Sequence, residues 1–256
     1  MIYIMVHIQM AMILLKSKSD INETKLVEQI ANDWGSGLEI SEFERTSQAF
    51  SFDWNKIQFI LSEIPTPFPS KDLELPSKTA YHWKEAEAEV SSHNSHILIF
   101  ARGEVDPIEI SKQLTRVTAS VCKISDSIGV FWGASSQVIQ DSLFIEQSNL
   151  LSSNKLPLML WIKTTGHKND DGTYYLHTIG LNLYGYVEFE IESYRKTYSE
   201  GFALLLELSS LVINNKSALK EGKIYIPIIQ DKIKLKYKKS SLNPVEDVIS
   251  IINSNS

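Results

Sequence analysis

The first half of the chain alternates between short apolar runs and amphipathic segments. Strands are predicted where apolar residues are continuous or alternate, and helices where they recur every three or four positions. A cap pair, Asp20 with Glu23, predicts the start of the first helix, and Gly35 predicts its end. The proline-rich stretch from Pro65 to Pro76 predicts an extended loop. The resulting assignment is strands at 9–16, 50–54, 57–64 and 96–101, and helices at 26–34 and 80–90.

The clearest helix start of the chain comes next. Asp106 has the character of an N-cap, Pro107 fits the first helical position and Glu109 fits the first turn, so a helix is predicted up to residue 124. Asp171 and Gly172 predict the turn of a hairpin. The remaining assignment is strands at 127–132, 158–163, 174–178, 183–191, 223–229 and 232–238, and helices at 137–149, at 202–213 and from 243 onward.

These elements, in this order, predict an α+β protein. The sheets are expected to be mixed and largely antiparallel, with helices packed on one face. The first six elements follow the strand, helix, strand, strand, helix, strand order of a ferredoxin-like unit. Because no linker of domain-separating length interrupts the chain, the prediction is one compact domain, 1–256. Two fused ferredoxin-like halves, 1–150 and 151–256, are the alternative.

The composition narrows the classes of function. The chain has 256 residues and is 43% hydrophobic, which is ample for a buried core. A formal net charge of −6 disfavours a nucleic-acid partner, because the phosphate backbone would be repelled. One alternating segment is rich in lysine, which is expected to keep a strand edge or open face solvated. Its lysines are Lys232, Lys234, Lys236, Lys238 and Lys239.

Two features bear on the compartment. Cys122 is the single cysteine, so no intramolecular disulfide can form, and its apolar neighbours predict a buried thiol. The apolar run 1–15 has no basic residues before it, contains His7 and Gln9, and is short for a membrane span. We therefore expect a cytoplasmic protein without a membrane partner.

One pair of histidines is a candidate metal site. His93 and His96 lie close in sequence, and His82 with Glu85 or Glu89 could join them from the preceding helix face. The competing interpretation is that the rings cap carbonyls or pack at the boundary between two elements. The second interpretation is favoured, so no metal and no cofactor are predicted.

Nucleophilic catalysis lacks a matching motif. The nearest string to a nucleophile turn, Gly133-Ala134-Ser135-Ser136, has no second glycine, and its serines are better explained as the N-cap of the next helix. The sequence contains neither a Walker phosphate loop nor a dinucleotide fingerprint. No catalytic residue is therefore predicted.

Carboxylates with neighbouring tyrosines are the candidate partner-binding residues. Glu188, Glu190 and Glu192 alternate along one strand, so they share a face, while Phe189 and Ile191 share the face expected to be buried. One interpretation is a solvated acidic face. The other is a docking surface for a basic protein, because interfaces use aromatic anchors and complementary charge. The candidate residues are Asp170, Asp171, Tyr184, Tyr186, Glu188 and Glu190.

Several short motifs, taken in order, resemble a bacterial family, the domain-of-unknown-function family 4261. The resemblance extends from about residue 10 to residue 238, and its strength lies in the order of the motifs. The motifs are Pro65, Pro67 and Pro69; Trp83 and Ala86 followed by His93 and His96; Thr115, Val117 and Ala119; Val130 and Trp132; and Gly180, Leu181, Gly185 and Glu188.

Proteins that look like this family are found near polymorphic-toxin loci, and the family has no established enzymatic activity. The resemblance therefore implies an immunity protein, which is not an enzyme. Such a protein binds and neutralises a cognate antibacterial toxin, for example a type VI secretion effector. The alternatives are a metal-dependent enzyme that uses His93 and His96, and an intracellular structural or interaction protein.

Overall fold

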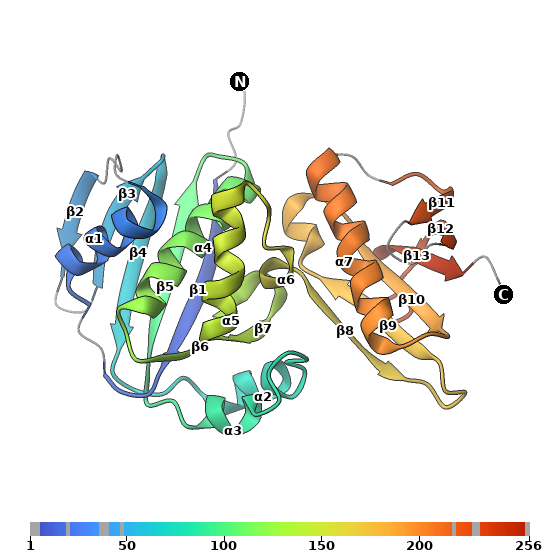
Figure 1. Cartoon of the computed structure of the whole chain (residues 1–256), viewed down its shortest axis with the longest axis horizontal. Helices are drawn as coiled ribbons and strands as arrows, with labels where there is room; N and C mark the ends of the chain where they lie inside the picture. Colours follow the sequence, from blue (N-terminus) through green and yellow to red (C-terminus); the bar gives the residue numbers. More distant parts are fainter. Residues whose placement is uncertain are drawn as a thin grey trace. The chain divides into compact units, whose positions relative to one another are not determined.

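The computed structural model describes residues 6–18, 21–35, 41–46, 49–216, 219–226 and 231–253. The chain folds into two compact units, Met1–Leu160 and Trp161–Ser256, each built on one sheet (Figure 1). Helices with largely antiparallel sheets confirm the α+β class. The sequence alternative placed a division after residue 150. No described helix is both long and apolar enough to cross a membrane.

Seven strands form the sheet of the first unit. They are β1 (His7–Leu15), β2 (Ser41–Arg45), β3 (Ala49–Trp54), β4 (Ile57–Ile64), β5 (Ser95–Gly103), β6 (Ser127–Trp132) and β7 (Gln137–Gln140). Their order is β2-β3-β4-β5-β1-β6-β7, and every neighbouring pair is antiparallel. β1 lies between β5 and β6, with Ala11 opposite both Ile99 and Trp132.

The strand order differs from that of a ferredoxin-like unit. Such a unit would place β1 between β4 and β5, antiparallel to both, because the helical connection after β4 carries the chain across β1 to a strand parallel with β4. Here β5 lies between β4 and β1 and pairs antiparallel with both. The segment that joins β4 to β5 therefore connects adjacent strands and crosses none. The ferredoxin-like alternative is wrong for this unit.

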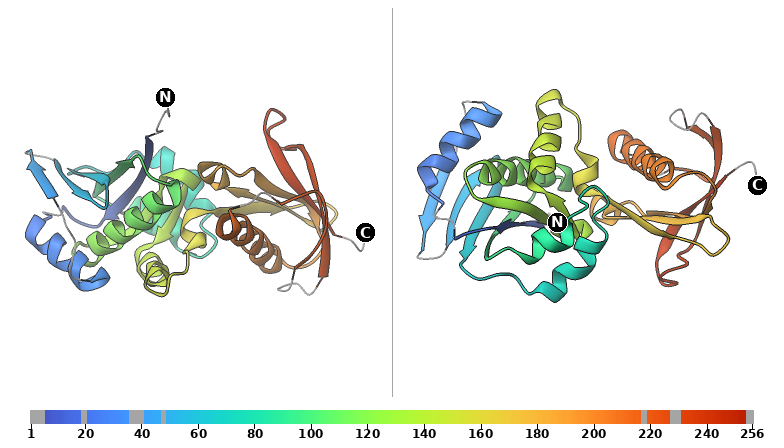
Figure 2. Two further views of the ribbon diagram at one scale, coloured as in Figure 1. Left: turned by 90° about the horizontal axis from the view of Figure 1, so that it is seen from above. Right: turned by 60° about the horizontal axis from the view of Figure 1, so that its bottom comes forward.

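Helices cover both faces of this sheet, whereas one covered face was predicted (Figures 1 and 2). α1, α4 and α5 lie on one face, and α2 and α3 lie on the other. Their bounds are α1 (Glu23–Trp34), α2 (Ser70–Lys78), α3 (Ala86–Ser91), α4 (Pro107–Lys123) and α5 (Asp141–Ser148).

β1 is buried on both of its faces. On one face, Met12 and Leu14 join the apolar core that α2 and α3 cover. On the other face, the Gln9 amide donates to the Pro107 carbonyl at 2.8 Å and accepts from Ser111 Oγ at 2.7 Å, which ties β1 to the start of α4. Two-sided burial explains why the segment reads as a nearly continuous apolar run.

Polar side chains tie α1 to α4. The Trp34 indole N–H donates to Ser120 Oγ at 3.1 Å, and Ser120 Oγ donates to Asp33 Oδ2 at 2.8 Å. Lys123 pairs with the same carboxylate at 2.7 Å. Because these side chains are partly buried, the bonds fix the position of α1 on α4 as well as satisfying each group.

The predicted start of α4 is confirmed. Asp106 Oδ1 accepts from the Ile108 N–H at 2.9 Å, and Pro107 occupies the first helical position. The helix ends at Lys123, one residue before the predicted end. Cys122 is confirmed as buried, and burial raises the pKa of its thiol to about 12. The thiol is therefore neutral and unreactive at ordinary pH.

The segment between β4 and β5 departs most from the sequence assignment. The predicted extended loop contains α2, and Pro76 lies inside that helix. Pro76 removes one backbone hydrogen bond in the last turn, but Leu73 and Pro76 are both buried, and their apolar burial offsets the loss. The helix predicted from residue 80 forms only from Ala86 onward, and turns precede it.

Further elements also differ from the prediction. The helix expected at 137–149 is preceded by β7, so α5 begins only at Asp141. Ser136 has a φ of 47° and ends a short turn instead of capping a helix. Residues 158–161 form a short helix, α6 (Leu158–Trp161), where a strand was expected. The helix α1 is capped by Asn22, and the predicted cap Asp20 lies outside the described residues.

Six strands form the sheet of the second unit. They are β8 (Lys163–Lys168), β9 (Tyr174–Ile179), β10 (Glu188–Tyr194), β11 (Gly222–Ile226), β12 (Asp231–Lys239) and β13 (Asp247–Asn253). Their order is β11-β12-β13-β10-β9-β8, and β10 with β13 is the parallel pair. β13 replaces the helix predicted from residue 243, because the segment pairs with β10 on one side and β12 on the other, with Val248, Ile249 and Ile251 buried.

One helix covers one face of the second sheet. α7 (Tyr198–Asn215) begins with the capping box of Thr197 and Glu200, and its Gly201 packs against Leu176 and Tyr194. The predicted hairpins around residues 171–172 and between β11 and β12 are confirmed. Residues 227–230, between β11 and β12, lie outside the described residues.

Substitution of Gly166 in β8 tests how closely β8 packs against β9 in the second sheet. A Cβ at this position would lie 1.9 Å from the Tyr175 carbonyl oxygen, so we expect Gly166→Ala to lower the free energy of unfolding by about 3 kcal/mol. A Cβ at Gly172 of the same hairpin would have no atom within 4 Å, but φ at this residue is +84°. We therefore expect Gly172→Ala to lower the free energy of unfolding by about 1 kcal/mol. Urea unfolding of both variants measures the difference. Equal losses would contradict the close approach of β8 to β9 at Tyr175.

Candidate partner-binding groove

The first of the predicted partner-binding carboxylates, Glu188, accepts its hydrogen bonds from groups within the second unit. Its side chain accepts from Thr178 Oγ1 at 2.7 Å, from the Gly180 N–H at 2.8 Å and from the Asn182 N–H at 3.2 Å. Burial raises the pKa of this carboxyl, and the hydrogen bonds oppose that rise. Glu188 therefore fixes the turn between β9 and β10, and its oxygens are already engaged.

The second predicted carboxylate, Glu190, is buried at 2% exposure. It accepts from Ser240 Oγ and, at 3.2 Å, from the Ser241 N–H, and Lys238 Nζ lies 3.7 Å away. Burial alone would raise the pKa of this carboxyl, but the hydrogen bonds from Ser240 and Ser241, together with smaller contributions that include the charge of Lys238, lower the pKa. The solvated acidic face expected from the alternation is therefore wrong at Glu190, because a loop distant in sequence covers it.

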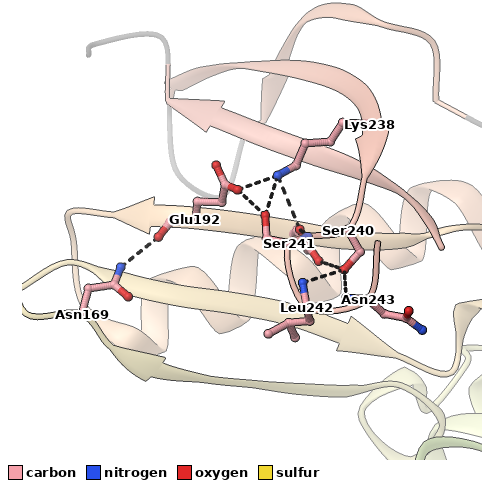
Figure 3. Close-up of polar contacts among 8 residues, drawn as sticks. Asn169, Glu192, Lys238, Ser240, Ser241, Leu242 and Asn243 are labelled. Atoms are coloured by element: carbon pink, nitrogen blue, oxygen red, sulfur yellow. Dashed lines mark hydrogen bonds and ion pairs between the residues drawn. The ribbon is translucent and has the colours of Figure 1, made fainter. Parts of the chain in front are cut away.

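Glu192 completes this polar network at the surface (Figure 3). Its carboxylate accepts from Lys238 Nζ at 2.6 Å and from Ser241 Oγ, and the bond from Lys238 is the main cause of its lowered pKa. Asn169 donates to the Glu192 carbonyl at 2.9 Å. Lys238, one of the lysines assigned to solvation, is therefore paired within the unit. Phe189 and Ile191 on the opposite face are buried, as predicted.

The remaining candidate residues lie in two places. Asp171 accepts from the N–H and the hydroxyl of Thr173, which lowers the pKa of Asp171 and closes the turn before β9; Asp170 is exposed in the same turn. Tyr184 and Tyr186 are half-buried beyond the other end of β9, and the Tyr184 ring lies 6.0 Å from the Trp161 ring. The six predicted residues thus do not form one acidic, aromatic strand face.

The histidine pair belongs to the first unit, and both rings are almost fully buried. His93 Nε2 accepts from the Phe68 N–H at 2.8 Å, so Nδ1 carries the proton that it shares with the Val90 carbonyl at 2.5 Å. Both nitrogens of His93 are therefore occupied by backbone groups, which leaves no lone pair for a metal. Among the described residues, no group of three or more His, Cys, Asp or Glu side chains could hold a metal ion.

His96 holds the same loop from a second point. Its Nδ1 bonds to the Thr66 carbonyl at 2.9 Å, and its ring meets the Phe68 ring edge-on at 5.5 Å. Burial lowers the pKa of His96, which favours the neutral ring. The two histidines together fix residues 66–68, the proline-rich loop that follows β4.

This fixed loop forms one wall of an open groove of about 650 Å³. α2 and α3 form the other walls, each with residues at helical spacing. Phe68, Leu73 and Val90 contribute apolar side chains to the lining of the groove, and Leu73 and Val90 are buried. The charged and polar lining consists of Ser70, Lys71, Glu74, Ser77, Glu87, Ser91, His93 and Asn94.

The sequence did not indicate this groove, because the prolines predicted a loop where α2 forms. The groove-lining residues of α2, Ser70, Leu73, Glu74 and Ser77, do recur at helical spacing, but only Leu73 is apolar, so hydrophobic periodicity gave no signal for this helix. The sequence also did not indicate Lys163, which is 6% exposed at the start of β8. Burial lowers the pKa of Lys163 to about 8.

Comparisons with protein-family models, with curated proteins and with solved structures find no match to this chain. The resemblance to family 4261 therefore stays a prediction.

His93 is expected to stabilise the groove rather than to bind metal. His93→Ala leaves the Phe68 N–H and the Val90 carbonyl without their partner, so we expect the free energy of unfolding to fall by roughly 2 to 4 kcal/mol. His82→Ala, at an exposed position before α3, is the control and should change it by less than about 1 kcal/mol. Elemental analysis of the purified wild-type protein is the second measurement. Stoichiometric metal that His93→Ala removes would refute the structural role.

The lowered pKa of Lys163 predicts that the free energy of unfolding increases at high pH. Its pKa is lowered from 10.5 to about 8 in the folded chain, so between these values the unfolded chain binds more protons than the folded one. Stability is therefore expected to increase as the pH rises from about 8 towards 10.5, and Lys163→Met should remove this increase. Lys168→Met, at the exposed end of the same strand, is the control. Urea unfolding across this pH range measures the slope, and an unchanged slope in Lys163→Met would contradict the assignment.

Proposed function

We propose that this chain is a binding protein whose protein partner occupies the groove between α2 and α3. The observation that carries the proposal is the groove itself, an open space of about 650 Å³ that is lined by both apolar and charged side chains. Interfaces commonly combine an apolar centre with a polar rim. The hydrogen bonds that His93 accepts from the Phe68 N–H and that His96 forms with the Thr66 carbonyl hold one wall in place, so binding would cost little ordering of that wall.

The distribution of charge favours a basic partner. Residues 1–160 contain 20 acidic and 13 basic side chains, whereas residues 161–256 contain 11 acidic and 12 basic side chains. The acidic excess of the chain therefore lies in the unit that carries the groove. A field of one sign attracts a partner of the opposite sign and speeds their association.

The partner that fits this chemistry and the family resemblance is a secreted antibacterial toxin with a basic toxic domain. In this function the chain acts as an immunity protein in the cytoplasm and neutralises the toxin by binding it. The competing proposal of a metal-dependent enzyme is weakened by His93, because both of its ring nitrogens are bonded to backbone groups. The neutralising function requires no catalytic group in the chain.

Binding to the product of the adjacent toxin gene tests this function. The two proteins are expected to co-purify, and expression of this chain should rescue cells that produce the toxin. Glu87→Lys combined with Ser91→Arg reverses charge and fills space at the groove, so we expect the dissociation constant to rise at least about tenfold, or 1.4 kcal/mol. Isothermal titration calorimetry measures the change.

Glu28→Lys is the matched control, because Glu28 is exposed on α1, away from the groove. It alters the net charge as Glu87→Lys does and should leave the affinity within about twofold of wild type. A toxin that neither co-purifies nor loses its effect on cells would reject the function. A complex that tolerates the groove variant as well as the control would reject the groove as its site.

A further inference from the structure

The hydrogen bonds that hold the loop wall of the groove depend on the protonation state of His93. This ring is 5% exposed, its Nε2 accepts from the Phe68 N–H at 2.8 Å, and its Nδ1–H donates to the Val90 carbonyl at 2.5 Å. A neutral imidazole has one donor and one acceptor nitrogen, and both are in use here. An imidazolium has two donors and no acceptor, so a protonated His93 would direct an N–H at the N–H of Phe68. The bond from Phe68 therefore exists only while His93 is neutral.

His96, which holds the other end of the same loop, is also held in its neutral form. The ring is 4% exposed, its Nδ1 bonds to the Thr66 carbonyl at 2.9 Å, and it meets the Phe68 ring edge-on at 5.5 Å. Burial is the main cause of its lowered pKa; the bond to Thr66 opposes this effect, and a charge on His93 would lower the pKa further. The loop in its fixed position thus favours two neutral rings.

The charged side chains around the two rings are of both signs. On the groove side, Lys71 and Glu74 of α2 and Glu87 of α3 line the same space as His93. On the other side, Lys18 and Glu63 line a small cavity together with His96. Glu74 forms an ion pair within its own helix, and Glu63 accepts from a backbone N–H at 2.7 Å. Neither imidazole bonds to a carboxylate among the described residues, so no such bond holds a proton on either ring.

Release of residues 66–68 would change the protonation of both rings. Once the loop moves away, the imidazoles lose their backbone partners, gain water and titrate near the ordinary histidine pKa of about 6.5. The released state therefore binds more protons in weak acid than the state with the loop in place. The hydrogen-bonded loop is fully stable at a pH above this value, and its stability is lost progressively as the pH falls below it.

We propose that the groove is a pH-sensitive binding site, in which protonation of His93 and His96 in weak acid releases residues 66–68 and with them the bound protein. Phe68 lines the groove, so its displacement removes part of the surface that the partner contacts. Histidine is the side chain whose charge changes in this pH range, and a switch of this kind needs one element with two arrangements. The release of the partner rests on the proposed function, whereas the movement of the loop is a property of this chain alone.

Hydrogen exchange of the Phe68 amide in the full-length chain, without a partner, tests the loop. After correction for the intrinsic exchange rate, we expect its protection to fall about tenfold between pH 7 and pH 5, while amides of α4 keep theirs. His93→Gln supplies an amide that can accept from the Phe68 N–H and does not titrate, so the fall should shrink to less than about twofold. His96→Gln is the second variant and should also reduce the fall. His167→Gln, at an exposed position of the second unit, is the control and should match wild type.

The outcomes separate this switch from the proposed function. Protection of Phe68 that stays constant down to pH 5, or that falls equally in wild type, His93→Gln and His96→Gln, refutes the switch whether or not the toxin binds. A toxin that does not bind at pH 7 rejects the proposed function, and the exchange measurement still decides the switch. For a toxin that binds, the dissociation constant of wild type should rise at least about tenfold between pH 7 and pH 5, and His93→Gln should remove the rise. An equal rise in both proteins would place the titrating group elsewhere and overturn the proposal.

Discussion

The burial of β1 on both faces is the constraint on which the first unit depends. A strand that is buried on one face needs one helical layer to cover it, but β1 needs a layer on each of its two faces. α4 supplies one cover and is anchored by the Gln9 amide; the layer of α2 and α3 supplies the other. The segment between β4 and β5 must therefore fold back over the sheet, although its prolines disfavour regular structure. Tertiary burial overrides local propensity at this point.

The groove follows from the way that second cover is built. α2 and α3 are short and are separated by turns, so they bury Met12 and Leu14 without closing the space between their own facing sides. The proline-rich loop borders that space and has few backbone hydrogen bonds of its own to hold it. His93 and His96 compensate, because each imidazole bonds to a backbone group of the loop. Two residues that suggested a metal site thus act as substitutes for missing secondary structure.

Local sequence patterns correctly predicted the elements that are specified by residues close together in the chain. The cap at Asp106 and the helix that follows it, the apolar run of β1 and the hairpin turn at Asp171 were all assigned from sequence. The errors fall where a partner distant in sequence decides the outcome. β7 forms because β6 offers a strand edge, and β13 forms because β10 and β12 lie on either side of it. Neither edge is visible in the local sequence.

Glu190 shows why the candidate site was harder to predict than the fold. Alternation correctly placed Glu190 opposite the buried face of Phe189, yet alternation describes direction and not solvent access. The groups that bury Glu190 come from Ser240 and Ser241, fifty residues later in the chain. A buried carboxylate requires such partners, since an unpaired charge is costly away from water. The same bonds that remove Glu190 from the surface fix the turn that exposes Leu242 and Val245.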